Sequence, residues 1–154
     1  MTQAIQQSLR DKAWARWTVL ILIALTMFFA YMFVDVLSPL KSMLEKTAEE
    51  GGLGWSSTVF GTYGSSEFFL NVFFFFLIFA GIILDKMGVR FTAVLSGALM
   101  VLGALIKVYA LSTTFNNGGF GFELFNSFMP SMPPSAKLAC VGFMIFGCGC
   151  EMGG

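Results

Sequence analysis

The sequence predicts an all-α integral membrane protein with about four transmembrane helices. Three observations support this fold class. The 154 residues are 56% hydrophobic and only 12% charged, about half the charged fraction of an ordinary soluble domain. Nineteen residues are Phe and none is His. Several apolar runs approach or exceed the roughly 20 residues that cross a hydrocarbon core about 30 Å thick. The formal net charge of zero argues against nucleic acid as a partner.

The first apolar run covers residues 17–37 and follows a short tail, residues 1–16. Three basic residues and one Trp lie in this tail: Arg10, Lys12, Trp14 and Arg16. Such residues are typical of a membrane–water interface on the cytoplasmic side. A signal peptide has a similar outline, but the run is too long and no small-residue cleavage site follows it. We therefore expect a transmembrane helix here.

Three further apolar runs predict spans at residues 56–84, 91–111 and 137–154. The segments between the spans, residues 39–54 and 112–135, are rich in the Gly, Pro, Asn and charged residues of extramembrane connections. Part of the first connection could instead continue the first helix beyond the bilayer.

Local signals indicate where the second span begins and which face of the third span is packed. Ser56 or Ser57 suits a helix start, because its hydroxyl can accept a hydrogen bond from a free backbone N–H. In the third span, Ala93, Gly97 and Ala104 lie near one face. This small-residue pattern lets membrane helices pack closely, so we expect the face to contact another helix.

Residues 81–90 form a short charged turn between the second and third spans. Gly88 suits the turn because a residue without a Cβ takes left-handed backbone angles at little cost. Asp85, Lys86 and Arg90 place opposite charges at the membrane edge. Gly81, one helical turn before Asp85, leaves a notch where another helix can approach.

This spacing resembles the signature loop between helices 2 and 3 of the major facilitator superfamily, Gly-x-x-x-Asp-Arg/Lys-x-Gly-Arg/Lys-Arg/Lys. The matching positions are Gly81, Asp85, Lys86, Gly88 and Arg90. Val89 departs, because a first basic residue is usual there. The resemblance implies a carrier of about twelve helices in two six-helix halves. We expect this chain to be an N-terminal fragment that supplies about four helices of the first half, with the second half missing.

In carriers of this superfamily the loop acts at the cytoplasmic gate. The resemblance implies that Asp85 lies near the positive N-terminal end of a helix in the second half. Arg90 and Lys86 would balance its charge. The alternative is an interfacial turn whose charges are simply solvated.

A second run, residues 142–151, resembles helix 4 in a branch of the superfamily that includes small-peptide carriers. That branch typically has Gly-Arg-Phe-Ile-Phe-Gly-x-Gly-x-Glu. The matching positions are Gly142, Ile145, Phe146, Gly147, Gly149 and Glu151. Phe143 replaces the arginine, which puts peptide specificity in doubt. The alternative is that Gly147 and Gly149 only permit close helix packing.

Polar residues within the spans are candidates for lining a solute cavity or for ion coupling, because an ionisable group in a bilayer costs at least a few kcal/mol. The candidates are Tyr31, Asp35, Glu67, Asn71, Lys107 and Glu151. Asp35 and Lys107 are the first pair to test, and Asp35 or Glu67 could carry a coupled proton. Alternatively, Lys107 extends to the interface while both carboxylates reach headgroup water.

The chain shows no pattern for a cofactor, a metal or catalysis. Cys140, Cys148 and Cys150 all lie in the fourth span and have no His to complete a metal site, so packing is the better interpretation. Without His, most hydrolytic mechanisms lack their base. We do not expect an enzyme.

Charge placement gives an orientation. With the N terminus in the cytoplasm, the tail and the 85–90 turn lie inside, whereas Lys41, Lys46 and Lys137 lie outside. The excess of basic residues is then cytoplasmic, as the positive-inside rule requires. We expect a multi-pass protein of the cell membrane, plasma or inner.

The predicted function is secondary active or facilitative transport of a small solute by alternating access, with or without a coupling proton or other ion. The alternative is a complete small four-helix membrane protein that acts as an oligomeric exporter or as a structural partner.

Overall fold

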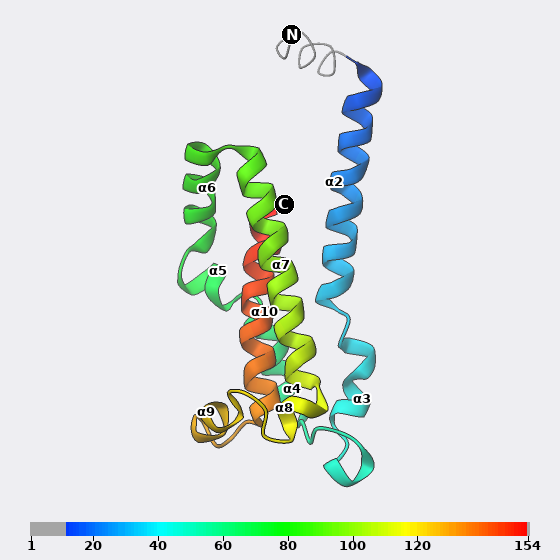
Figure 1. Cartoon of the computed structure of the whole chain (residues 1–154), viewed down its shortest axis with the longest axis vertical. Helices are drawn as coiled ribbons and strands as arrows, with labels where there is room; N and C mark the ends of the chain where they lie inside the picture. The colour runs from blue at the N-terminus through cyan, green and yellow to red at the C-terminus, as the bar shows by residue number, and fades with distance from the viewer. Residues whose placement is uncertain (1–11, 154) are drawn as a thin grey trace.

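The computed structural model describes residues 12–153, and every regular element within them is a helix (Figure 1). In chain order the elements are α2 (Ala13–Val34), η1 (Ser38–Leu40), α3 (Lys41–Leu44), η2 (Ala48–Glu50), α4 (Ser57–Ser66), α5 (Phe69–Phe73), α6 (Phe76–Met87), α7 (Val89–Leu111), α8 (Thr113–Asn116), α9 (Phe122–Ser127) and α10 (Pro134–Gly153).

Three segments of the described chain are long and apolar enough to cross a membrane. They are Ala13–Leu44, Val89–Leu111 and Pro134–Gly153, and they coincide with three of the predicted spans. The first segment is not one uniform helix, because α2 ends at Val34 and Asp35 follows as its C-cap. The all-helical fold is therefore confirmed for the described residues, and three of the four predicted spans coincide with segments that are long and apolar enough to cross a membrane.

The prediction of one continuous helix over residues 56–84 is wrong. The start is as expected, since the Ser56 hydroxyl accepts a hydrogen bond of 3.2 Å from the Val59 backbone N–H. The helix then stops twice, between α4 and α5 and between α5 and α6. At the second break Phe75 has a φ of 49°. A right-handed helix cannot continue through a residue in the left-handed region.

The core of the molecule is the pair α7 and α10, which run side by side (Figure 1). Their backbones approach closely at glycines. A Cβ added at Gly103 would lie 2.5 Å from both the Gly142 carbonyl oxygen and the Phe146 backbone nitrogen. Further along, the Ser96 hydroxyl donates a 2.7 Å hydrogen bond to the Gly149 carbonyl.

The small-residue face predicted for the third span is therefore partly wrong. Ala93 is exposed, and nothing lies within 4 Å of a Cβ built at Gly97. Ala104 does pack against the core. The buried positions of α7 instead follow Thr92, Ser96, Gly103, Lys107 and Ala110. The packed face lies around Gly103 because Gly142 of α10 offers no side chain at that point.

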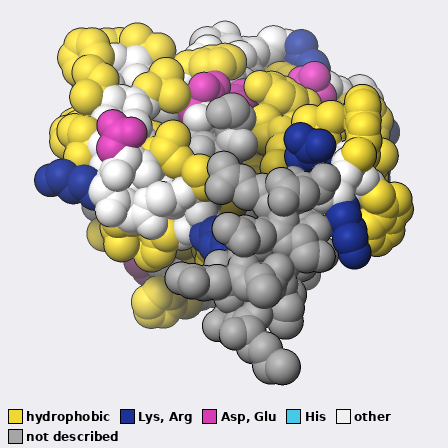
Figure 2. Space-filling view, turned by 90° about the horizontal axis from the view of Figure 1, so that it is seen from above, with side chains coloured by type: hydrophobic (Ala, Val, Ile, Leu, Met, Phe, Trp, Pro, Cys, Tyr) yellow, Lys and Arg dark blue, Asp and Glu magenta, His cyan; other side chains and the backbone are white. Residues whose placement is uncertain are grey.

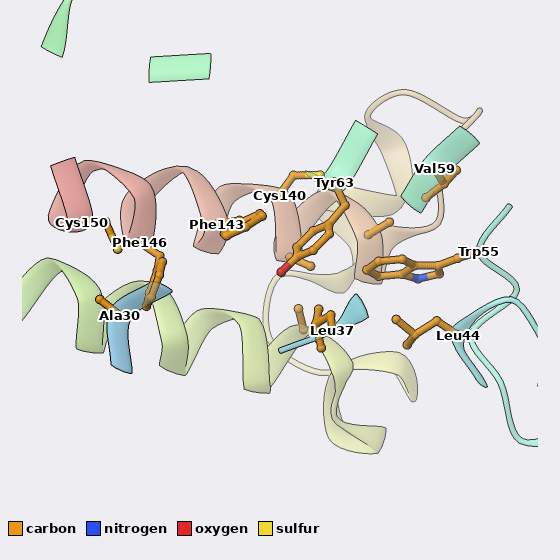
Figure 3. Packing of buried hydrophobic residues seen from close by; sticks show 13 residues of the cluster. Ala30, Leu37, Leu44, Trp55, Val59, Tyr63, Cys140, Phe143, Phe146 and Cys150 are labelled. Carbon is orange, nitrogen blue, oxygen red and sulfur yellow. The ribbon is translucent and has the colours of Figure 1, made fainter. Parts of the chain in front are cut away.

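Aromatic side chains fill the space between α4 and the first half of α10 (Figure 3). The Tyr63 and Phe143 rings stack with centroids 4.7 Å apart. Trp55, only 1% exposed, donates a 3.0 Å hydrogen bond from Nε1 to the Ser135 hydroxyl. This bond ties the segment before α4 to the first turn of α10. All three cysteines are buried and free, as packing residues should be.

Helix α2 stands largely apart from this core (Figure 1). Ala30 is its only buried residue, and most of its large apolar side chains are exposed. Exposed apolar side chains along a helix long enough to span a bilayer are suited to contact with lipid.

Candidate functional site

The charged turn joins α6 and α7 through a single residue. Gly88 follows Met87 at the end of α6 and precedes Val89 at the start of α7. Its φ of 82° and ψ of 165° fall in a region that is essentially limited to glycine. The expected need for a positive φ is confirmed. The turn lies at the same end of the molecule as the start of α2 (Figure 1).

The charges of the predicted gate motif all lie close to this joint. Asp85 and Lys86 are in the last turn of α6, and Arg90 is in the first turn of α7. All three are exposed, and within residues 12–153 none of them forms an ion pair. Figure 2, seen from above this end, shows basic and acidic side chains scattered among hydrophobic ones. A Cβ built at Gly81 has no neighbour within 4 Å, so that face of α6 is open.

Three predicted site residues form a buried polar set in the interior. Glu67, between α4 and α5, is 7% exposed; Asn71 of α5 is 8% exposed; Lys107 of α7 is 4% exposed. The chain therefore holds ionisable groups of opposite sign inside an apolar bundle.

Lys107 is held by aromatic rings rather than by a carboxylate. Its Nζ lies 4.5 Å from the centroids of both the Phe143 and Phe146 rings, a cation–π arrangement. It also donates a 3.4 Å hydrogen bond to the Phe33 carbonyl. Within the described residues the one ion pair is Lys41–Glu45, so the expected Asp35–Lys107 pair is not formed. Extension of Lys107 to the interface is not seen either, because its side chain is buried.

Two buried polar side chains lack hydrogen-bond partners in the described part of the chain. They are Tyr63, through its hydroxyl, and Asn71, through both amide atoms. A buried polar group without a partner costs about 1–3 kcal/mol. Sequence reasoning missed Tyr63, although its position four residues before Glu67 and eight before Asn71 placed all three on one helical stripe.

A cavity of about 260 Å³ opens beside this stripe. Its wall comes from the end of α2, from α4 and from α10, and consists of Val34, Asp35, Leu37, Ser38, Phe60, Tyr63, Gly64, Glu67, Phe68 and Phe143. The two charged groups in the wall are both carboxylates. Asp35 is exposed, and its Oδ1 accepts a 3.4 Å hydrogen bond from the Ser38 hydroxyl.

The remaining candidates lie outside this wall. Tyr31 is exposed on α2, and Glu151 is partly buried near the end of α10. Gly147, from the second motif, packs directly against Glu67. A Cβ there would lie 2.7 Å from the Glu67 carbonyl oxygen and 2.8 Å from its Cγ. Close packing at Gly147 and Gly149 is thus present in the structure.

Within residues 12–153, no three His, Cys, Asp or Glu side chains come together to hold a metal ion. Comparisons with protein-family models, curated proteins and solved structures found no match to this chain.

Proposed function

We propose that the chain forms part of a secondary transporter of the major facilitator kind, which moves a small solute by alternating access. The observation that carries the proposal is the buried polar set, Glu67, Asn71 and Lys107, within an apolar helical bundle. Ionisable groups in a membrane interior are costly and mark solute or ion pathways. A purely structural bundle would be more stable with apolar side chains at these positions.

The α6–α7 joint supports the same proposal. Asp85, Lys86 and Arg90 lie within one helical turn of Gly88 on each side, at the end of the molecule where α2 begins. In the proposed carrier this end faces the cytoplasm of a cell in whose plasma or inner membrane the protein lies. Asp85 there contacts the N-terminal end of a helix in the second half and closes the gate. The strength of that contact sets the balance between outward-facing and inward-facing states.

The test is Asp85→Asn in the protein encoded by the complete reading frame, reconstituted into proteoliposomes. Uptake of a panel of radiolabelled amines, amino acids and sugars is measured with and without an inward proton gradient. We expect uptake to fall about tenfold, equivalent to about 1.4 kcal/mol lost from the gate contact. The melting temperature should change little, because Asp85 is exposed.

Glu123→Gln is the matched control, since it removes an exposed carboxylate from α9, far from the joint in Figure 1. It should leave uptake unchanged. If Asp85→Asn unfolds the protein without a specific loss of transport, the gating role is wrong. The alternative of a structural four-helix membrane protein would then be favoured.

A further inference from the structure

We propose that the cavity between the end of α2, α4 and α10 binds a small organic cation with a substituted ammonium group. This inference rests on the proposed transport function and names the chemical class of its solute. Its basis is the combination of two wall carboxylates, several aromatic rings and one unpartnered hydroxyl.

The two charged side chains of the cavity wall are both carboxylates. Asp35 and Glu67 both line the cavity, and no Lys or Arg belongs to the wall. Lys107 lies behind the wall, against the Phe143 and Phe146 rings and the Phe33 carbonyl, and the Lys41 Nζ lies 5.6 Å from the Phe60 centroid. The two wall carboxylates attract a bound cation and repel an anion.

The aromatic side chains of the wall suit a cation in a second way. Phe60, Tyr63 and Phe68 also line the cavity, and the Phe60 and Tyr63 centroids are 6.0 Å apart. Ring faces attract ammonium groups, and cages of such rings recognise substituted ammonium ligands. Phe143 completes the wall, but its ring already stacks on Tyr63 and faces Lys107.

Tyr63 supplies an independent sign that a ligand is accommodated. The residue is 2% exposed and its hydroxyl has no hydrogen-bond partner within the described residues. In Figure 3 the hydroxyl points toward Leu37, another residue of the wall. A solute whose binding brought a polar atom to this hydroxyl would remove the cost of about 1–3 kcal/mol of leaving it unpaired.

The volume sets the size of the solute. At about 30 Å³ per water-sized group, a cavity of about 260 Å³ accommodates a solute of roughly eight non-hydrogen atoms. Choline is within this limit. Its neutral isostere, in which a tert-butyl group replaces the trimethylammonium group, has the same shape without the charge.

The experiment is isothermal titration calorimetry of the purified full chain in lipid nanodiscs, with choline and its neutral isostere as probes. We expect choline to bind at least about tenfold more tightly than the isostere. Glu67→Gln should weaken choline binding by about tenfold or more, because a desolvated charged partner is lost. Asp35→Asn should weaken it less, since Asp35 is exposed, and Glu123→Gln should have no effect.

Equal binding of choline and its isostere, or unchanged choline binding in both Glu67→Gln and Asp35→Asn, would overturn the proposal. Preference for an analogue with a carboxylate in place of the ammonium would do so as well. Because Asp35 lies at the surface, its variant remains informative if Glu67→Gln does not fold. If choline binds but the complete carrier takes up no solute, the transport proposal is contradicted and the binding site is retained. If other solutes are taken up and choline does not bind, the binding site is contradicted and the transport proposal is retained.

Discussion

The α7–α10 pair and the α4–α5–α6 segment are both rich in apolar residues and glycine, yet they fold differently. The helices of the pair are continuous over 23 and 20 residues, and Gly103 of α7 and Gly142 and Gly149 of α10 each face the backbone of the partner helix. The other segment is divided into helices of 10, 5 and 12 residues. A Cβ at its glycines, Gly61, Gly64 and Gly81, would meet nothing within 4 Å. Glycine supports close helix packing only where a partner backbone fills the space that the missing side chain leaves.

The largest expected effect comes from filling the closest contact of the pair. Gly103→Leu would drive a side chain into the backbone of α10 around Gly142 and Phe146. We expect a loss of about 3 kcal/mol or more, because overpacking against backbone cannot be relieved by a rotamer change. Thermal unfolding of the detergent-solubilised protein measures it. Gly97→Leu, on the open face of the same helix, should lower the free energy of unfolding far less. Equal losses in the two variants would contradict the view that a facing backbone makes the Gly103 position special.

A smaller effect is expected where α10 meets the broken segment. Gly147→Ala places a methyl group 2.7 Å from the Glu67 carbonyl oxygen, so Glu67 and its neighbours must shift. We expect a cost of about 1–3 kcal/mol together with weaker choline binding. Gly64→Ala adds a methyl group to α4 without any close contact. It should be neutral or slightly stabilising for a helix, and the same thermal scan compares the two variants.

The smallest effect has the opposite sign. Phe75→Gly should stabilise the protein by about 1 kcal/mol, because Gly adopts positive φ without the clash that any other residue suffers there. The Phe75 side chain is exposed, so little packing is lost. Phe74→Gly, at a φ of −101°, should not stabilise. If both variants lower the melting temperature equally, the break between α5 and α6 is not strained as described.

The contrast also shows what the sequence could predict. Three apolar runs were long enough to define spans, and the Ser56 cap and the Gly88 turn followed from local chemistry. The breaks in the second span could not be predicted, because residues 73–76 are all Phe and give no period or polar residue to mark a helix end. The packed face of α7 was missed for a different reason. Close packing at Gly103 depends on Gly142 of α10. A contact between two distant segments cannot be read from the residue pattern of either segment alone.

The candidate site was predicted in part for the same reasons. Burial of Glu67, Asn71 and Lys107 agrees with their selection as polar residues in apolar runs. The prediction of an Asp35–Lys107 ion pair failed, because the depth of a residue along its helix does not determine how the helix is rotated about its own axis. Tyr63 was overlooked because aromatic side chains are common in membrane helices. Only the structure shows that its buried hydroxyl lacks a hydrogen-bond partner within the described residues.

The indole of Trp55, held by its hydrogen bond to Ser135, can serve as an intrinsic fluorescence probe in this protein. The chain has three Trp residues, of which Trp14 and Trp17 are exposed on α2 while Trp55 is enclosed. With Phe in place of both α2 residues, the emission would come from Trp55 alone. Its ring lies 5.7 Å from that of Tyr63, a residue of the cavity wall. Separation of α4 from α10 would admit water to the indole and shift its fluorescence to longer wavelength, so movements beside the cavity could be followed without any added dye.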